Sequence, residues 1–197
     1  MMLAEWSVEC AAEDPVLVVP WSDPDSSAHF VDLRENPYDL DHLPEAEQNP
    51  PLMQALRSLN AARSPVFTAK CDAWPLDAEE LETVCLNLDL SVSDTPAGFG
   101  SYIDLLWRDR PIFISFHQQE QLLSRLARRA ASLDHPQATL EYVLRPALVD
   151  LVGPQEGFAV SLYVRAVGSD PHTAWELWAS ALDAVVAQLR SKDLALA

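Results

Sequence analysis

The last third of the chain joins a strand pattern directly to a helix pattern, and this order restricts the fold more than any other feature. Between Gly157 and Val167 apolar residues alternate with polar ones, as expected for a strand that buries one face. Asp170 and Pro171 then open a helix. The stripe that follows has helical spacing and consists of Trp178, Ala181, Leu182, Val185, Val186 and Leu189. The sequence therefore predicts a strand followed by a helix that packs on the sheet.

Further elements are predicted upstream of this unit. Asn49, followed by two prolines, indicates a helix that ends near Arg63, because Pro65 disfavours helical geometry at the residue before it. Asp77 and Glu80 have the spacing of a capping box, which predicts the start of a short helical turn. The segments that read as strands are 5–10, 16–19, 30–33, 66–71 and 83–90, and the last of these has the cleanest alternation.

The middle of the chain suggests a hairpin and leaves one segment ambiguous. Residues 101–107 and 111–116 are rich in strand formers and are separated by three residues, so we predict a hairpin, followed by a helix over 117–133. Residues 138–152 fit helical spacing, but Pro146 would break a helix. We therefore predict a break at Pro146 and a strand over 147–152 that pairs with 157–167.

These elements indicate an α+β fold with a mainly antiparallel sheet and helices packed on one face. On this interpretation a strand-strand-helix unit occurs twice in the C-terminal half, at 101–133 and 147–191. The length of 197 residues suits a single domain over 1–197, and the alternative is a division into an acidic part, 1–95, and a hairpin-helix part, 96–197. Three cysteines without CxxC spacing favour reduced thiols and a cytoplasmic location, and no segment is apolar enough to predict a membrane span.

Negative charge is concentrated in the first hundred residues. Nineteen carboxylates face four basic side chains there, a formal balance of −15, whereas the remaining residues hold nine basic and eleven acidic side chains. A local field of one sign attracts partners of opposite charge and repels nucleic acid and anionic lipid headgroups. We therefore expect a basic protein partner, and no binding of nucleic acid or membranes.

Sequence motifs for catalysis are weak. The closest glycine pair, Gly98 and Gly100, lacks the Lys and Ser/Thr of a phosphate-binding loop, and no GxSxG segment is present. His117 and Glu120 lie three residues apart at the start of a predicted helix, and Asp104 on a neighbouring strand could approach them as part of an acid-base site. Acidic residues at a helix start are also favoured by the helix dipole alone.

Candidate binding residues lie elsewhere. Trp21 and Trp74 stand beside prolines near strand ends, where an exposed aromatic side chain could anchor a partner, and the favoured alternative is packing in the core or over it. Asp39 and Asp41, close to His42 and downstream of His29 and Asp32, could hold a cation. A solvated acidic loop is the simpler explanation, because no spacing fixes a ligand geometry, and we predict no metal and no cofactor. Cys71 reads as a buried structural thiol, and Arg125, Arg128 and Arg129 read as a solvated helix face.

Two functions follow as hypotheses. The first is a soluble, non-enzymatic interaction protein, such as an adaptor, inhibitor or chaperone, that presents its carboxylate-rich N-terminal surface to a basic partner. The alternative is a small-molecule-binding domain or enzyme with a pocket between sheet and helices near Asp104, His117 and Glu120.

Overall fold

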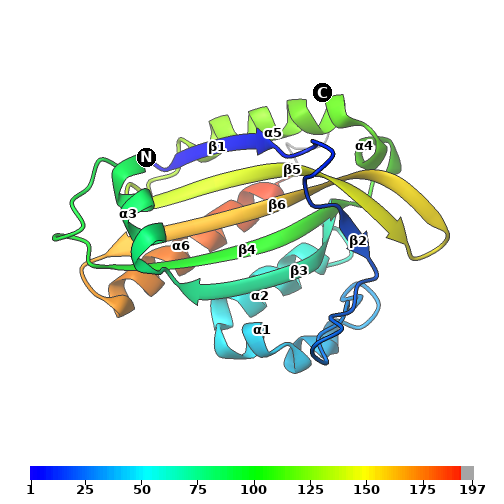
Figure 1. Cartoon of the computed structure of the whole chain (residues 1–197), viewed down its shortest axis with the longest axis horizontal. Helices are drawn as coiled ribbons and strands as arrows, with labels where there is room; N and C mark the ends of the chain where they lie inside the picture. Colours follow the sequence, from blue (N-terminus) through cyan, green and yellow to red (C-terminus); the bar gives the residue numbers. More distant parts are fainter. Residues whose placement is uncertain (192–197) are drawn as a thin grey trace.

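A six-stranded mixed sheet organises the protein, and the predicted α+β class is confirmed. The computed structural model describes residues 1–191, apart from the side chains of residues 38, 41 and 42. Two strands run parallel to β5 along the same edge, and the other three strand pairs are antiparallel (Figure 1). The strand order is β1 (Leu3–Val8), β5 (Ala138–Asp150), β6 (Pro154–Gly168), β4 (Ala97–Trp107) and β3 (Val66–Pro75), and β2 (Leu17–Val19) pairs with the far end of β5.

The longer helices cover one face of this sheet, which we call the covered face. They are α2 (Pro50–Asn60), α5 (Phe116–Ala130) and α6 (Pro171–Leu189), and shorter elements are η1 (Pro37–His42), α1 (Pro44–Gln48) and α4 (Arg110–Ile114). The opposite, open face carries α3 (Ala78–Asn87) at one end, where this helix packs on Val167 (Figure 1). No helix among residues 1–191 covers the middle of the open face.

The predicted strand and helix at the C-terminal end are both present, as β6 and α6. Trp178 of α6 is completely buried, packs against Phe99 with 4.7 Å between ring centroids and an interplanar angle of 55°, and donates its indole N–H to the hydroxyl of Ser101 at 2.9 Å. The N-cap carboxylate of Asp170 accepts hydrogen bonds from the hydroxyl and the backbone N–H of Thr173. These bonds lower the pKa of Asp170 to about 2.

The strand predicted over 83–90 is wrong, because these residues continue the helix that Asp77 begins. The predicted capping box is present, and α3 runs for ten residues, with Leu81, Val84 and Cys85 buried at helical spacing. The helix ends where Asp89 adopts a left-handed conformation at φ 56° and the N–H of Leu90 bonds to the carbonyl of Cys85 at 2.9 Å. The apparent alternation arose because this short apolar run fits both periods.

The hairpin predicted over 101–116 is also wrong in its second half. Residues 101–107 lie in β4, but β4 pairs with β3 and β6. Residues 110–114 form α4, since Pro111 suits the first turn of a helix. The first strand-strand-helix unit is therefore absent, whereas the second is present as β5, β6 and α6.

Pro146 does not break its segment. Residues 138–150 form the single strand β5, which pairs with β6 throughout. The predicted partner strand is therefore correct, but the register differs: residues 147–150 pair with 154–157, and residues 158–166 pair with 138–146. On its other side β5 pairs with β1 up to Leu144 and with β2 from Ala147. Pro146 lies in the gap between these two partners, where no strand requires its missing N–H.

Residues 30–33, predicted as a strand, form none; the chain there makes an isolated bridge between Ser22 and His29 and then buries Leu33. None of the described helices has the length and apolar character needed to cross a bilayer.

Candidate functional site

Half-exposed aromatic side chains cross the middle of the open face. Trp74 of β3, Tyr102 of β4 and Tyr163 of β6 form a row with centroid separations of 6.2 Å and 6.0 Å, which we call the aromatic ladder. The guanidinium of Arg165 lies 4.9 Å from the ring centre of Tyr163. Trp, Tyr and Arg are the residues most often found at the centre of protein interfaces.

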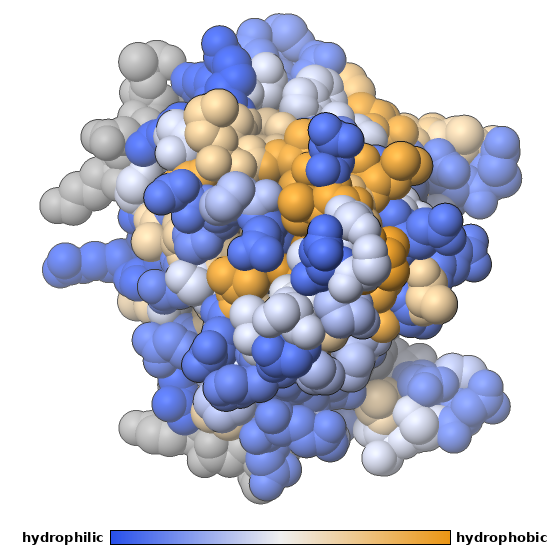
Figure 2. Space-filling model, turned by 90° about the vertical axis from the view of Figure 1, so that its left-hand side faces the viewer, coloured by the Kyte–Doolittle hydropathy of each residue, from blue (hydrophilic) through white to orange (hydrophobic). Residues whose placement is uncertain are grey.

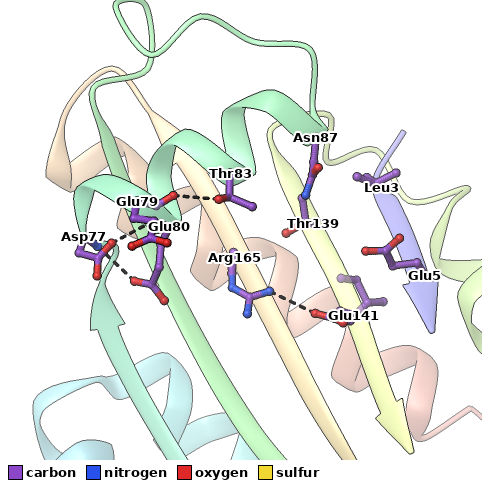
Figure 3. Close-up of a pocket in the computed structure, with 11 residues that line it drawn as sticks. Leu3, Glu5, Asp77, Glu79, Glu80, Thr83, Asn87, Thr139, Glu141 and Arg165 are labelled. Carbon is purple, nitrogen blue, oxygen red and sulfur yellow. Dashed lines mark hydrogen bonds and ion pairs between the residues drawn. The ribbon is translucent and has the colours of Figure 1, made fainter. Parts of the chain in front are cut away.

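A pocket of about 300 Å³ lies beside this ladder, between α3 and the sheet. Figure 3 shows side chains of α3 facing Arg165 of β6, Glu141 of β5 and Glu5 of β1. Five carboxylates and a single guanidinium line it, a formal balance of −4. We call it the acidic pocket, and its charged members are Glu5, Asp77, Glu79, Glu80, Glu141 and Arg165.

Three of the five carboxylates are already engaged. Asp77 and Glu80 cap α3 reciprocally, and Glu80 also accepts the indole N–H of Trp74 at 3.0 Å. Glu141 lies 3.6 Å from the guanidinium of Arg165. Glu5 and Glu79 are exposed, and neither carboxylate has a hydrogen bond or ion pair with any described residue.

Glu5 and Glu141 place two negative charges next to each other on the open face. They are register partners on neighbouring parallel strands, and like charges placed directly opposite one another destabilise a sheet. Arg165 reaches only one of them. An added positive charge in the pocket would relieve this repulsion.

The surroundings of the pocket are also acidic. Residues 71–107, which include α3, hold eight carboxylates and no Lys or Arg. Elsewhere the front section is partly neutralised, as where Arg145 lies 2.8 Å from Glu9. The segment around α3 is therefore one of two strongly acidic stretches, the other being residues 11–47, which hold ten carboxylates and one Arg.

Apolar side chains are exposed at the same end of the molecule. Met1 is 81% exposed, Leu86 of α3 78%, and Leu3, which lines the acidic pocket, 37%. Figure 2 views this end and shows an apolar patch surrounded by hydrophilic side chains. An apolar patch with a charged rim is typical of a protein interaction surface.

The three residues of the predicted acid-base site are not brought together. Asp104 accepts a hydrogen bond from Ser161, and both belong to the open face. His117 and Glu120 lie on α5, which packs on the covered face, and Phe116 there contacts Phe158. His117 is exposed and pairs with Glu120 at 3.4 Å and with Gln121 at 2.9 Å. This geometry does not support acid-base catalysis by these residues.

Asp104 is nevertheless a buried carboxylate on the open face. Burial raises its pKa, while the Ser161 hydroxyl and the charges of Arg145 and Lys70 oppose that rise. A raised pKa in the folded state means that the folded protein binds more protons than the unfolded chain between the two pKa values. The stability contribution of Asp104 therefore falls as the pH rises through this window.

We expect Asp104→Asn to gain stability relative to the natural protein as the pH rises from about 3 to 7, because the amide carries no charge to bury. Each unit of pKa difference between the two states corresponds to about 1.4 kcal/mol. Denaturant unfolding of both proteins across this pH range measures the effect. A stability difference that stays constant with pH would show that the carboxylate titrates at its ordinary pKa.

Trp74 and Trp21 occupy different environments. Trp74 belongs to the aromatic ladder beside the acidic pocket. Trp21 donates its indole N–H to the carbonyl of Ala69 at 2.8 Å, at the point where β3 bulges between Thr68 and Lys70. Lys70 covers the ring of Trp21 at 4.8 Å. The visible role of Trp21 is to hold the loop before η1 against the edge of β3.

The candidate cation ligands Asp39 and Asp41 lie in η1 and do not line the acidic pocket. Asp39 is half-buried there, and the side chain of Asp41 falls outside the described residues. No group of three potential metal ligands comes together among the described residues. Asp32, upstream, is engaged with Arg34.

Other sequence features have structural explanations. Burial raises the pKa of the Cys71 thiol to about 12, so this thiol is protonated near neutral pH. Gly98 and Gly100 lie within β4, not in a loop, and a Cβ at either would come within 2.8 Å of the side chain of Leu76. The glycines thus allow the residues before α3 to pack directly on the strand.

Arg125 and Arg128 line a shallow groove between α5 and β1.

The main residues of the acidic pocket were missed at the level of the sequence. Glu5, Glu79, Glu141 and Arg165 come from four different elements, and only the capping box at Asp77 and Glu80 marked the region. The concentration of carboxylates in residues 71–107 was the one local signal that could have indicated the pocket.

Comparison with protein-family models, with curated proteins and with solved structures found no match, so a function can be inferred only from these side chains.

Proposed function

We propose that this protein is an interaction protein that binds a basic protein partner at its α3 end, with an Arg or Lys side chain of the partner entering the acidic pocket. The observation that carries the proposal is the pair of neighbouring carboxylates, Glu5 and Glu141, of which only Glu141 is paired with a guanidinium, that of Arg165, among the described residues. A second guanidinium or an ammonium group would complete the charge pairing.

The surroundings support a protein partner over a free cation. The aromatic ladder lies on one side of the pocket, and exposed apolar side chains, including Leu3, lie at the same end. Together these provide apolar contact area around a charged centre, as in most protein interfaces. The acidic segment 71–107 would accelerate association with a basic surface.

The proposal predicts that Glu5→Gln combined with Glu79→Gln weakens binding of a labelled tetra-arginine peptide roughly five- to tenfold at low salt, from typical values for exposed charge pairs. Both carboxylates lack partners within the described chain, so their loss should leave the fold intact. Fluorescence anisotropy measures the affinity.

The matched control removes the same amount of charge elsewhere. Glu35 and Glu47 are exposed and lie outside the acidic pocket, so Glu35→Gln with Glu47→Gln should change the affinity by less than about twofold. Equal weakening by the two double variants would mean that the peptide responds only to net charge, and the pocket would have no special role.

A further inference from the structure

Positive charge gathers at one cavity in this strongly acidic protein. The cavity has a volume of about 270 Å³ and lies where β4 ends, beside the β5–β6 hairpin. Arg34, Arg108 and Arg110 line it, and no lining residue among those described is acidic. We call it the arginine cavity.

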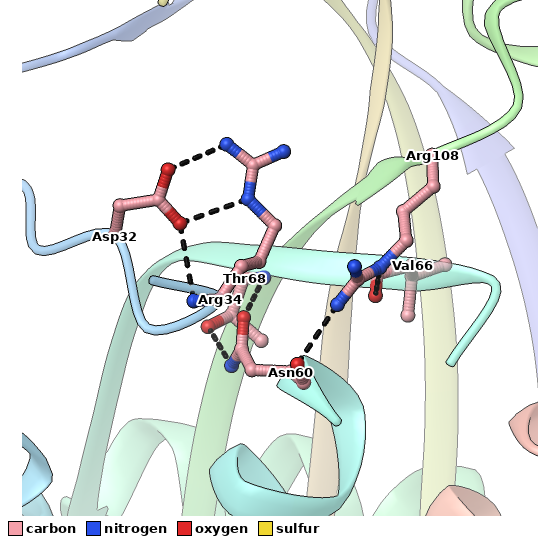
Figure 4. Close-up of polar contacts among 6 residues, drawn as sticks. All are labelled: Asp32, Arg34, Asn60, Val66, Thr68 and Arg108. Carbon is pink, nitrogen blue, oxygen red and sulfur yellow. Dashed lines mark hydrogen bonds and ion pairs between the residues drawn. The ribbon is translucent and has the colours of Figure 1, made fainter. Parts of the chain in front are cut away.

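Two of these guanidiniums are held in place by the fold (Figure 4). Arg108 donates to the carbonyls of Asn60 at 2.8 Å and Val66 at 3.0 Å, which ties the end of α2 to the start of β3. Arg34 lies 3.9 Å above the ring of Phe67 and bonds to the carboxylate of Asp32. Side chains fixed in this way lose little freedom when a ligand binds.

The positive charges are only partly compensated. Asp32 is the single carboxylate bonded to any of the three arginines among the described residues. Burial and the neighbouring charge of Arg34 both lower the pKa of Arg108. Arg110, at the first position of α4, is exposed and makes no hydrogen bond or ion pair with a described residue. The described residues around the cavity therefore carry a net positive charge.

The floor of the cavity determines what kind of anion fits. Phe67, Leu106 and Phe113 line it and are almost completely buried. A fully hydrated inorganic ion gains nothing from such a surface, whereas a ligand with an apolar body does. The volume lies just below the range of about 300–1,000 Å³ that is usual for ligand pockets, so the ligand must be small.

We propose that the arginine cavity binds a small monocarboxylate with an apolar body. The guanidinium of Arg110 is free to pair with the carboxylate through two parallel N–H···O bonds. Arg34 and Arg108, whose Nε and Nη2 groups already bond to Asp32 and to backbone carbonyls, add positive charge. The apolar body rests on the phenyl rings and Leu106. The site is separate from the acidic pocket, and no residue lines both.

Calorimetric titration of the full chain with phenylacetate tests the proposal. We expect measurable binding of phenylacetate, and binding at least tenfold weaker for inorganic phosphate, which lacks the body, and for 2-phenylethanol, which lacks the charge. Phosphate binding as tightly as phenylacetate would overturn the apolar part of the site, and the alcohol binding equally well would overturn the role of the arginines.

Variants locate the binding. Arg110→Gln should weaken phenylacetate binding about tenfold, as expected for a lost charge-assisted hydrogen bond. Arg63 is also exposed but does not line the cavity. The Arg63→Gln variant should therefore bind phenylacetate with the affinity of the natural protein. Equal affinities of the two variants, or no heat of binding in any protein, would contradict the proposal. A normal thermal unfolding profile of both variants confirms that the fold is retained.

Discussion

Replacing Gln119 by Leu should lower the free energy of unfolding by about 3–5 kcal/mol, one of the largest effects available from a single substitution in this chain. The side chain is completely buried on α5. Its amide oxygen accepts the indole N–H of Trp107 at 3.1 Å. Its amide nitrogen lies within 3.1 Å of three backbone carbonyls, those of Ile112, Phe113 and Phe158. Leucine fills the space but removes the partner of the indole N–H and of the Phe113 and Phe158 carbonyls. The Ile112 carbonyl keeps its bond from the N–H of Ser115. Each unpaired buried group costs about 1–3 kcal/mol.

A matched control is present on α6. Gln188 is also buried, but it makes one hydrogen bond, to the carbonyl of Leu126, and its amide oxygen has no partner among the described residues. Gln188→Leu should therefore cost less than about 1 kcal/mol, since it removes one unpaired group and creates another. Denaturant unfolding compares the two variants. Similar losses would mean that the network around Gln119 contributes no more than ordinary packing.

Replacing Trp178 by Ala should cost about 3–5 kcal/mol, because the cavity left behind adds to the lost transfer free energy of the indole. The substitution also removes the donor to Ser101 and the packing partner of Phe99. Both contacts join α6 to β4, so we expect the packing of this helix on the sheet to weaken along with the loss of stability. Thermal and denaturant unfolding measure the loss.

Trp175 provides the control for this prediction. It lies one turn earlier on α6, is half-buried, and contacts Trp178 with 6.3 Å between ring centroids. Trp175→Ala should cost about 1–2 kcal/mol, in proportion to its smaller buried area. If both alanine variants lost the same stability, burial at position 178 would not be the source of the effect.

The parts of the fold that the sequence predicted are those with local determinants. The helix after Asp170 follows from an N-cap, a proline and a stripe of apolar residues, and all three are present as expected in α6. The start of α3 was predicted from Asp77 and Glu80 for the same reason. The extent of α3 was not, because Val84, Leu86, Leu88 and Leu90 satisfied strand alternation over too short a run.

The wrong predictions at Pro146 and at residues 110–114 have the same cause. Each segment is locally compatible with more than one secondary structure, and tertiary contacts select one of them. Pro146 is compatible with a strand only because β1 and β2 leave a gap on that side of β5. Residues 110–114 form a helix beyond the end of β4, and there the carbonyls of Ile112 and Phe113 bond to Gln119. Neither arrangement could be predicted from the residues of the segment itself, because the deciding contacts come from other elements.

The candidate site shows the same limit. The excess of carboxylates in the first hundred residues predicted a basic partner, and it remains the reason for that proposal. The pocket itself depends on the parallel pairing of Glu5 with Glu141 and on the position of α3 above Arg165, which no spacing in the sequence reveals. Trp74 and Asp104 were candidate site residues because of their side-chain chemistry alone. The fold places both on the open face, whereas His117 lies on α5, which packs on the covered face.

The central claim is that a basic group binds between α3 and the sheet, and an NMR titration of the isotope-labelled protein with an arginine-rich peptide tests it most directly. We predict that amide shifts concentrate at β1, α3 and the start of β5, and that the indole N–H of Trp74, which bonds to Glu80, shifts with them. Shifts centred on α1 or the loop before it, or spread evenly over the acidic surface with Trp74 unchanged, would contradict the claim.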